Sequence, residues 1–229
     1  MKNSFKNFIL VLFFYSCLIE IVSANEPFIF DVTEIEILKN GNQINGYNGG
    51  TATSEDGSKI IAEKFYYNKL TNILEAVGNV KYVDKIKNIV ITADNAIYFK
   101  NKERIFTKGN SRAISEKNII TASNLEFDKF QNIFHAETNA EIKDFEKDTT
   151  INADKITYLK NDEKIFTEGE TKAFIEKKYI FNSKNVTYYK NANILSSEKK
   201  SSVEDDNGNI YNLDNFLFNT QNKTLKGER

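Results

Sequence analysis

The sequence predicts an all-β protein built from repeats of about 30 residues, each contributing two short strands. A marker position, usually a small residue two positions after an apolar one, recurs at spacings of 31, 29, 31, 30 and 30 residues, which is typical of a repeat architecture. Apolar and polar residues alternate within each repeat, as they do along a half-buried strand. With 18 Phe and 11 Tyr and no long window of helical period, the composition also favours strands.

The first strand of each repeat contains one irregular step. Apolar residues stand two positions before, three after and five after the marker, as in Ile91, Ala96 and Tyr98 around Ala93. Steps of two keep side chains on one face of a strand, and the single step of three breaks that pattern. We therefore expect a bulge or kink in every repeat that curves the sheet. The marker residues are Ala62, Ala93, Ala122, Ala153, Ser183 and Leu213.

A polar turn and a second strand complete each repeat. Turns such as Lys100-Asn101 and Lys160-Asn161 carry residues that tolerate turn geometry and end strands. The next strand opens with a large apolar residue and has a small one two positions later. Glycines interrupt this strand and predict a bulge or a close approach of two backbones. They are Gly78, Gly109 and Gly169.

The ends of the chain differ from the repeats. Lys2 and Lys6, an apolar run over 8–21 and the small-x-small site ending at Ala24 predict a signal peptide over 1–24 and an exported domain over 25–229. An uncleaved anchor and a lipid-attachment role for Cys17 are the alternatives. Residues 28–37 are expected to form a starting strand, and the Gly/Asn-rich stretch 41–50 a turn region. Residues 225–227 resemble a strand before its glycine, so we expect the parent chain to continue into a C-terminal domain.

The composition argues against several functions. The 31 basic and 32 acidic residues balance, which gives no reason to expect nucleic-acid binding. Cys17, the single cysteine, falls in the expected signal peptide, so the exported part would hold no disulfide and no Cys-based metal site. His135 is the single histidine, and Asp94 and Asp154 are expected on a solvated face rather than as a catalytic pair. We predict no catalytic residues, no metal and no cofactor.

The repeats resemble those of a known family. The segments ITADNAIYFKNKERIFTKGN, INADKITYLKNDEKIFTEGE and IIAEKFYYNKLTNILEAVGNV are similar to the repeat of the OstA-like lipopolysaccharide transport domain, over about residues 58–227. Members include periplasmic bridge proteins of the LptA type, anchored proteins of the LptC type, and the N-terminal domain of outer-membrane assembly proteins of the LptD type. The ending NIYNLDNFLFNTQNKTLKGER and the near-neutral charge favour the LptD type, with LptA next.

The resemblance implies a fold, a ligand and partners. It implies an elongated, V-shaped β-jellyroll in the periplasm or at the outer membrane, whose apolar interior holds the acyl chains of lipopolysaccharide (lipid A) without making or breaking a bond. The implied lining is Ile91, Tyr98, Ile105, Leu125, Phe127, Phe134, Ile151, Ile156, Tyr158 and Ile165. Other Lpt bridge jellyrolls would join edge to edge at a strand containing Phe28, Phe30, Val32, Ile35 and Ile37. An LptD-type parent would add an outer-membrane barrel and its lipoprotein partner, without the disulfides that tie several such domains to their barrel.

Two other functions are alternatives. An extracytoplasmic structural or adhesive protein would have the same strands around a sealed core. A carbohydrate-active parallel β-helix enzyme would have coils shorter than about 30 residues and inward acidic clusters, which this sequence does not show. Access of a lipid to the inner face distinguishes the first of these from a lipid conduit.

Overall fold

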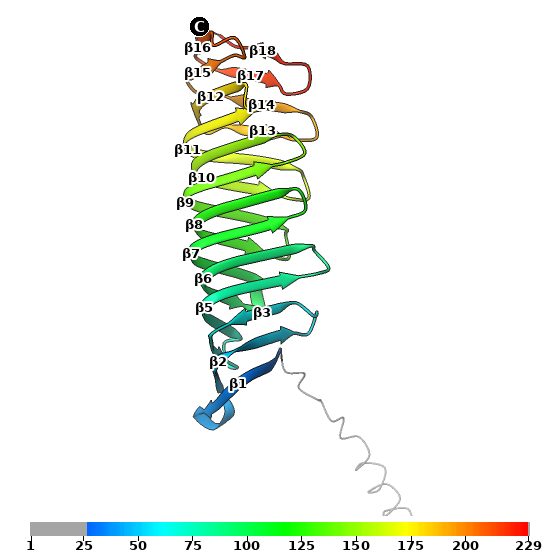
Figure 1. The fold of residues 1–229 in the computed structure, drawn as a ribbon, viewed down its shortest axis with the longest axis vertical. Helices are drawn as coiled ribbons and strands as arrows, with labels where there is room; N and C mark the ends of the chain where they lie inside the picture. The colour runs from blue at the N-terminus through cyan, green and yellow to red at the C-terminus, as the bar shows by residue number, and fades with distance from the viewer. Residues whose placement is uncertain (1–26, 229) are drawn as a thin grey trace, which may run out of the picture.

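The computed structural model describes residues 27–228 as one elongated stack of antiparallel strands (Figure 1). The long strands are β1 (Phe28–Leu38), β2 (Gln43–Ser54), β5 (Ile73–Asp84), β6 (Ile89–Phe99), β7 (Arg104–Ser115), β8 (Asn118–Asp128), β9 (Ile133–Asp144), β10 (Thr149–Leu159) and β11 (Lys164–Ile175). The shorter strands are β3 (Lys59–Ala62), β4 (Lys64–Asn68), β12 (Tyr179–Lys184), β13 (Thr187–Tyr189), β14 (Ile194–Ser197), β15 (Ser201–Glu204), β16 (Ile210–Leu213), β17 (Phe216–Asn219) and β18 (Thr224–Lys226). Single 3-10 turns lie at Lys39–Gly41 and Lys100–Lys102. The expected signal peptide falls outside the described residues.

Each of the long central strands pairs with the next one along the chain, so this part of the sheet grows by hairpins along the long axis. β5 to β11 pair in sequence order, all antiparallel. At both ends the long strands are split in two, because β2 pairs with both β3 and β4, and β11 with both β12 and β13. The predicted repeat of two strands is confirmed.

A bulge divides each long strand into two halves, as the irregular step in the sequence predicted. The register shifts lie at Val77/Val80, Thr92/Asn95, Lys108/Ser111, Thr121/Asn124 and Ala153/Lys155. A bulge bends its strand. Because the bulges lie side by side, the whole sheet bends along one line.

In several strands a glycine next to a carboxylate shapes the bend. Gly109 and Gly169 have φ angles of +79° and +82°, a region that side chains with a Cβ rarely adopt, and a Cβ at either position would collide with the carboxylate of Asp94 or Asp154. Asp94 accepts a hydrogen bond of 3.0 Å from the Asn110 side chain. Both acids therefore lie on the outer face, as expected, and Asp94 has a structural partner there.

The bend brings the two halves of the sheet face to face. The first half-sheet contains 73–77, 95–99, 104–108, 124–128, 133–137, 155–159 and 164–168, and the second contains 80–84, 89–93, 111–115, 118–122, 140–144, 149–153 and 171–175. Rings from opposite halves meet in the interior: Tyr82 and Tyr98 lie 6.5 Å apart, and Phe181 and Phe218 lie 4.9 Å apart. The protein is thus an elongated all-β jellyroll with a folded, V-shaped sheet around one core.

The expected turn region at 41–50 is wrong for most of its length. The turn ends at Asn42, and β2 runs through the Gly/Asn-rich stretch. Gly46 and Gly50 allow close packing on β1, because a Cβ on Gly46 would lie 3.0 Å from Val32 Cγ1 and one on Gly50 would collide with the backbone oxygen of Asp31. Glycine inside a strand often marks such an approach rather than a turn.

Candidate functional site

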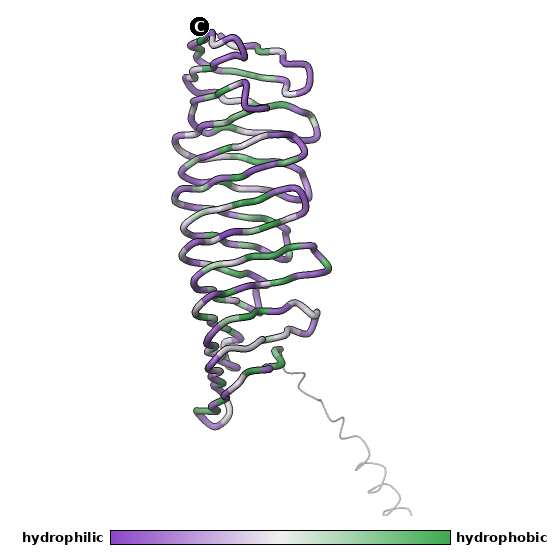
Figure 2. Tube along the Cα trace, in the orientation of Figure 1, coloured by the Kyte–Doolittle hydropathy of each residue, from purple (hydrophilic) through white to green (hydrophobic). Residues whose placement is uncertain are grey.

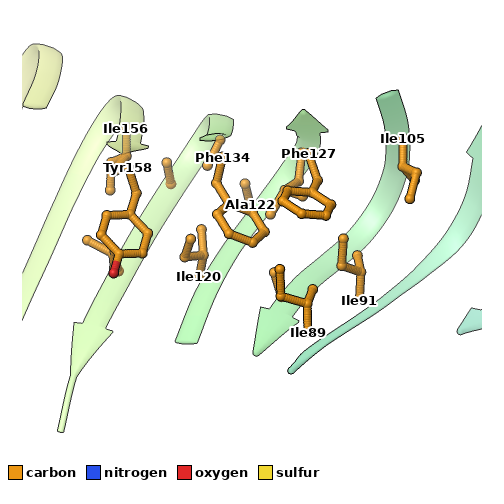
Figure 3. Packing of buried hydrophobic residues seen from close by; sticks show 14 of the residues in the cluster. Ile89, Ile91, Ile105, Ile120, Ala122, Phe127, Phe134, Ile156 and Tyr158 are labelled. Carbon is orange, nitrogen blue, oxygen red and sulfur yellow. The ribbon is translucent and has the colours of Figure 1, made fainter. Parts of the chain in front are cut away.

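The inner faces of the two half-sheets form one continuous apolar interior. All ten residues predicted to line it are at most 2% exposed, and they belong to a core cluster that extends from Phe28 to Phe218. Figure 3 shows Ile91, Ile105 and Phe127 projecting from neighbouring strands toward the same space. The predicted lining residues are therefore brought together on one inner surface.

Side chains fill this interior in the described state. Phe127 stacks on Phe134 with ring centroids 4.6 Å apart, and Phe134 lies 6.3 Å from Tyr158 in a parallel arrangement. Figure 2 shows the apolar residues distributed along the strands, with polar residues at the turns on both sides. A ligand in the interior would take the place of contacts such as these.

Tyrosine hydroxyls mark the border between the interior and its rim. Tyr98 donates a 2.5 Å hydrogen bond to Glu103, and Tyr158 donates one of 2.9 Å to Glu163, each to the acid five residues later. Burial, with the neighbouring Glu103 carboxylate, raises the pKa of Tyr98 far above its usual value, and burial likewise raises that of Tyr158. These hydroxyls thus remain protonated donors.

Two rows of turns face each other across the mouth of the V. Rim 1 joins strands of the first half-sheet and rim 2 joins strands of the second. Rim 1 comprises the turns 69–72, 100–103, 129–132, 160–163, 190–193 and 220–223, and rim 2 comprises the turns 55–58, 85–88, 116–117, 145–148, 176–178 and 205–209.

Side chains from the two rims meet along a seam. Lys87 of rim 2 donates a 2.7 Å hydrogen bond to Asn132 of rim 1, although the two are 45 residues apart. Lys160 of rim 1 pairs with Glu116 of rim 2 at 3.0 Å. Further contacts across the seam join Lys147 to Asn193 and Lys223 to Glu176. The mouth of the V is therefore spanned by polar contacts.

Lys129 forms the first of two buried ionic clusters in this seam. Its ammonium contacts Asp56 and lies 3.5 Å from Asp84 and 3.8 Å from Glu103, and its side chain is 7% exposed. Burial acts to raise the pKa of Asp56, but hydrogen bonds from Lys129 and two serines outweigh it and hold that pKa well below its usual value. The Asp56 carboxylate at the seam is therefore ionised at neutral pH.

Lys190 forms the second cluster at the equivalent turn two repeats later. Its ammonium lies 3.0 Å from Asp144 on the rim-2 side and 2.5 Å from Glu163 along rim 1. Burial acts to lower the pKa of Lys190, but the hydrogen bonds to these two carboxylates outweigh it, and the net shift is upward. Removing one partner of a buried ion pair leaves an uncompensated charge and strongly destabilises the protein. Both clusters therefore hold the closed seam together.

These lysines belong to a row that the sequence reasoning missed as a site. One lysine opens each of five rim-1 turns, and the signal was present in the sequence at spacings of 31, 29, 31 and 30 residues. In each repeat its backbone N–H donates to the preceding rim-1 turn, for example Lys129 N–H to Glu103 O at 2.9 Å and Lys190 N–H to Glu163 O at 3.0 Å. We call these residues the lysine row: Lys69, Lys100, Lys129, Lys160 and Lys190.

The predicted partner edge divides into an inner and an exposed part. Phe28 is buried, and Phe30 and Val32 are half-buried against the core. Ile35 and Ile37 are 51% and 62% exposed. Among the described residues β1 pairs with β2 alone, so one edge of this strand presents its backbone groups together with exposed apolar side chains.

The C-terminal end of the interior opens into a hollow of about 530 Å³. Tyr179, Leu213, Phe218 and Leu225 supply apolar walls, and Lys223 and Asp205 lie at its border. At this hollow the core cluster reaches the surface of the C-terminal end of the stack.

We also searched the described residues for a metal site and for membrane-spanning helices. Over 27–228, no group of three or more His, Asp or Glu is placed to hold a metal ion. His135 is exposed, and its ring nitrogen lies 3.0 Å from the Thr157 hydroxyl. No helix in that range is long and apolar enough to cross a membrane.

Comparison with known proteins gives the family. The fold is a jellyroll built from repeats. Its candidate site is the apolar inner face of the two half-sheets. The family model described as OstA-like protein matches residues 29–153, more than half of the 229 residues, and the chain belongs to this family. No curated protein sequence matches the chain.

One solved structure is also similar. It is the crystal structure of LptH, the LptA homologous periplasmic component of the conserved lipopolysaccharide transport device from Pseudomonas aeruginosa. It is 15% identical, with a TM-score of 0.45, over 49% of this chain and 83% of that chain. The assignment to the family therefore depends on the family match, and the fold on the strand pairing described above.

Proposed function

We propose that this protein binds lipopolysaccharide in the periplasm through the lipid A acyl chains and passes it toward the outer membrane. The observation that supports this most is the uninterrupted apolar interior, which runs through successive repeats of a member of the OstA-like family. Each buried CH₂ contributes about 0.8 kcal/mol, so several acyl chains could be held by apolar contacts alone. A uniform wall without a single specialised site suits a ligand that moves along it.

A sealed-core structural protein is the second candidate, and one observation favours it. The ten inner residues are at most 2% exposed, so acyl chains reach them only if the half-sheets separate or the inner side chains move. Lipid binding by the isolated protein separates these two functions.

The test is a binding titration of the purified, exported chain with fluorescent lipid A. We expect saturable binding that unlabelled lipopolysaccharide displaces. A chain that is folded by circular dichroism and binds neither lipid would overturn the proposal and leave the sealed core.

We further propose that β1 continues the stack into a neighbouring bridge jellyroll. An unpaired strand edge is a template for another strand, and Ile35 and Ile37 would be covered by that neighbour. Replacing both by Lys should weaken association with the bridge protein in a pull-down while leaving the unfolding midpoint unchanged, since both side chains are already exposed. Ile97→Lys, on the outer face of β6 and 37% exposed, is the matched control and should associate normally.

Within the family, we infer a role of the LptD type, as the periplasmic domain of an outer-membrane assembly protein. The near-neutral net charge of −1 and the resemblance at residues 209–229 support this assignment. Fractionation of cells tests it: the full-length protein should be found in the outer membrane together with a lipoprotein partner. Recovery as a free periplasmic protein would instead support the LptA type.

A further inference from the structure

We propose that the seam between the rims is the entrance through which a lipid reaches the interior, and that the lysine row binds the phosphates of that lipid. On entry Lys129, Lys160 and Lys190 exchange the carboxylates that they face across the seam for the phosphate groups. This inference rests on the proposed function and specifies the route and the headgroup contacts.

The seam is the boundary of the interior that can open without breaking a strand ladder. Along the bend, continuous strands join the two half-sheets, and each flank is a hydrogen-bonded sheet. Across the mouth, the described contacts are made by side chains, such as Lys87 with Asn132 and Lys160 with Glu116. Separation of the rims therefore preserves the backbone pairing and replaces apolar contacts between half-sheets by contacts with acyl chains.

The lysine row supplies cations where a headgroup would lie. The row stands at the border of the interior, since the Lys190 ammonium lies 5.2 Å from the ring centroid of Tyr158, a lining residue. Strands in a sheet are about 4.8 Å apart, so a two-strand repeat advances by about 10 Å and brings one lysine with each step. Lysine ammonium groups bind phosphate as point charges. A phosphate that moved along the seam would meet a new lysine at every repeat.

The replacement of carboxylates by phosphates on the lysines offsets the free-energy cost of opening the seam. In the closed seam Lys129 faces Asp56 and Asp84, and Lys190 faces Asp144. If the rims simply parted, these buried charges would lose partners. A phosphate that takes the place of the carboxylate keeps each ammonium paired, while Asp56, Asp84 and Asp144 become hydrated. The lipid's own anionic groups thus favour the open state.

Exposed apolar side chains on both rims point to an amphiphile rather than to a simple anion. Leu70 and Phe130 at the tips of rim-1 turns are 76% and 84% exposed, and Ile86 and Phe145 at the tips of rim-2 turns are 81% and 64% exposed. Single exposed apolar residues are ordinary, but these four flank one seam that also carries the lysine row. Acyl chains and phosphates therefore find complementary groups at the same mouth.

A chemical lock across the seam tests the entrance. In the exported chain, Lys87→Cys with Asn132→Cys places two thiols across the seam, and Asn72→Cys with Asn101→Cys, whose side chains are hydrogen-bonded at 2.9 Å along rim 1, is the matched control. Each pair is treated with a short bis-maleimide and titrated with lipid A. We expect the lock across the seam to weaken binding at least about tenfold, equivalent to 1.4 kcal/mol, and the control crosslink to leave it unchanged.

The outcomes separate this inference from the proposed function. If the uncrosslinked variants do not bind lipid A, the proposed function fails and the inference fails with it. If they bind, and the lock across the seam binds equally well, the entrance lies elsewhere and only the inference is overturned.

Removal of two seam lysines tests the phosphate contacts. Lys100→Gln with Lys160→Gln removes two members of the row that are only 16% exposed yet have partly exposed partners, so the variant should fold. The control is Lys155→Gln with Lys184→Gln, which removes two exposed ion pairs to Glu137 and Glu170. We expect the seam variant to bind diphosphorylated lipid A about tenfold more weakly and dephosphorylated lipid A normally, with no change in the control. Equal effects on the two lipids, or no effect on either, would rule out the phosphate role.

Discussion

At the scale of single residues, a glycine beside a carboxylate shapes the bend of β7 and that of β11, whereas Thr138 and Asn139 take the positive φ angles in β9. Gly109 occupies a left-handed backbone conformation beside the carboxylate of Asp94, and the same pair recurs 60 residues later as Gly169 and Asp154. The acid needs the space that a missing Cβ leaves, and the glycine supplies the positive φ. Because all repeats share one bend line, an error at one bend affects the packing of its neighbours.

We predict that Gly109→Ala destabilises the protein more than Gly57→Ala. Both glycines have nearly the same φ, +79° and +80°, but a Cβ at Gly57 meets nothing within 4 Å. Gly57→Ala should cost about 1 kcal/mol for the backbone alone, whereas Gly109→Ala also displaces Asp94 and should cost about 1–3 kcal/mol more. Urea unfolding measures both, and equal midpoints would show that the Asp94 contact does not matter.

At the scale of the strand pair, one aromatic position recurs at the border between interior and rim. It is occupied by Tyr67, Tyr98, Phe127, Tyr158 and Tyr188, all at most 1% exposed. In Tyr98 and Tyr158 the hydroxyl connects the apolar interior to an acid of the adjacent turn. Phe127 shows that the position accepts a ring without a hydroxyl.

We predict that stability falls at alkaline pH and that Tyr158→Phe falls less steeply than the parent. Burial raises the pKa of Tyr158 in the folded state, so its contribution is fully present below the unfolded value of about 10 and is lost as pH rises above it. Each such tyrosine adds a slope of about 1.4 kcal/mol per pH unit there. Unfolding midpoints measured between pH 8 and 11 check this, and parallel curves for parent and variant would contradict it.

At the scale of the whole molecule, repetition gives one enclosed apolar interior of considerable length, closed on one side by a bend and on the other by a seam. Backbone pairing holds the flanks and the bend, whereas side chains such as Lys129 and Lys190 hold the seam. The molecule therefore has one direction in which it can open while its strands stay paired.

Much of this structure could be predicted from the sequence because it is local and repeated. The two-residue period placed Ile151, Ile156 and Tyr158 on the inner face, and the step of three located the bend. The seam could not be predicted, because its partners lie 44–73 residues apart in the chain, from Lys160 and Glu116 to Lys129 and Asp56. These side chains come into contact only because the bend and the twist of several successive strands bring the two rims together. The strand through Gly46 was missed because glycines that allow close packing resemble those of a turn.

The most direct measurement is photo-crosslinking in living cells that export the full-length protein, with a photoreactive amino acid at Ile156 or, as the control, at Lys155. These neighbours lie on opposite faces of β10, Ile156 being 1% exposed and the Lys155 side chain 52% exposed. We predict that lipopolysaccharide is captured at Ile156 and not at Lys155. Folded, exported protein that captures no lipid at Ile156 would show that the interior is a sealed core.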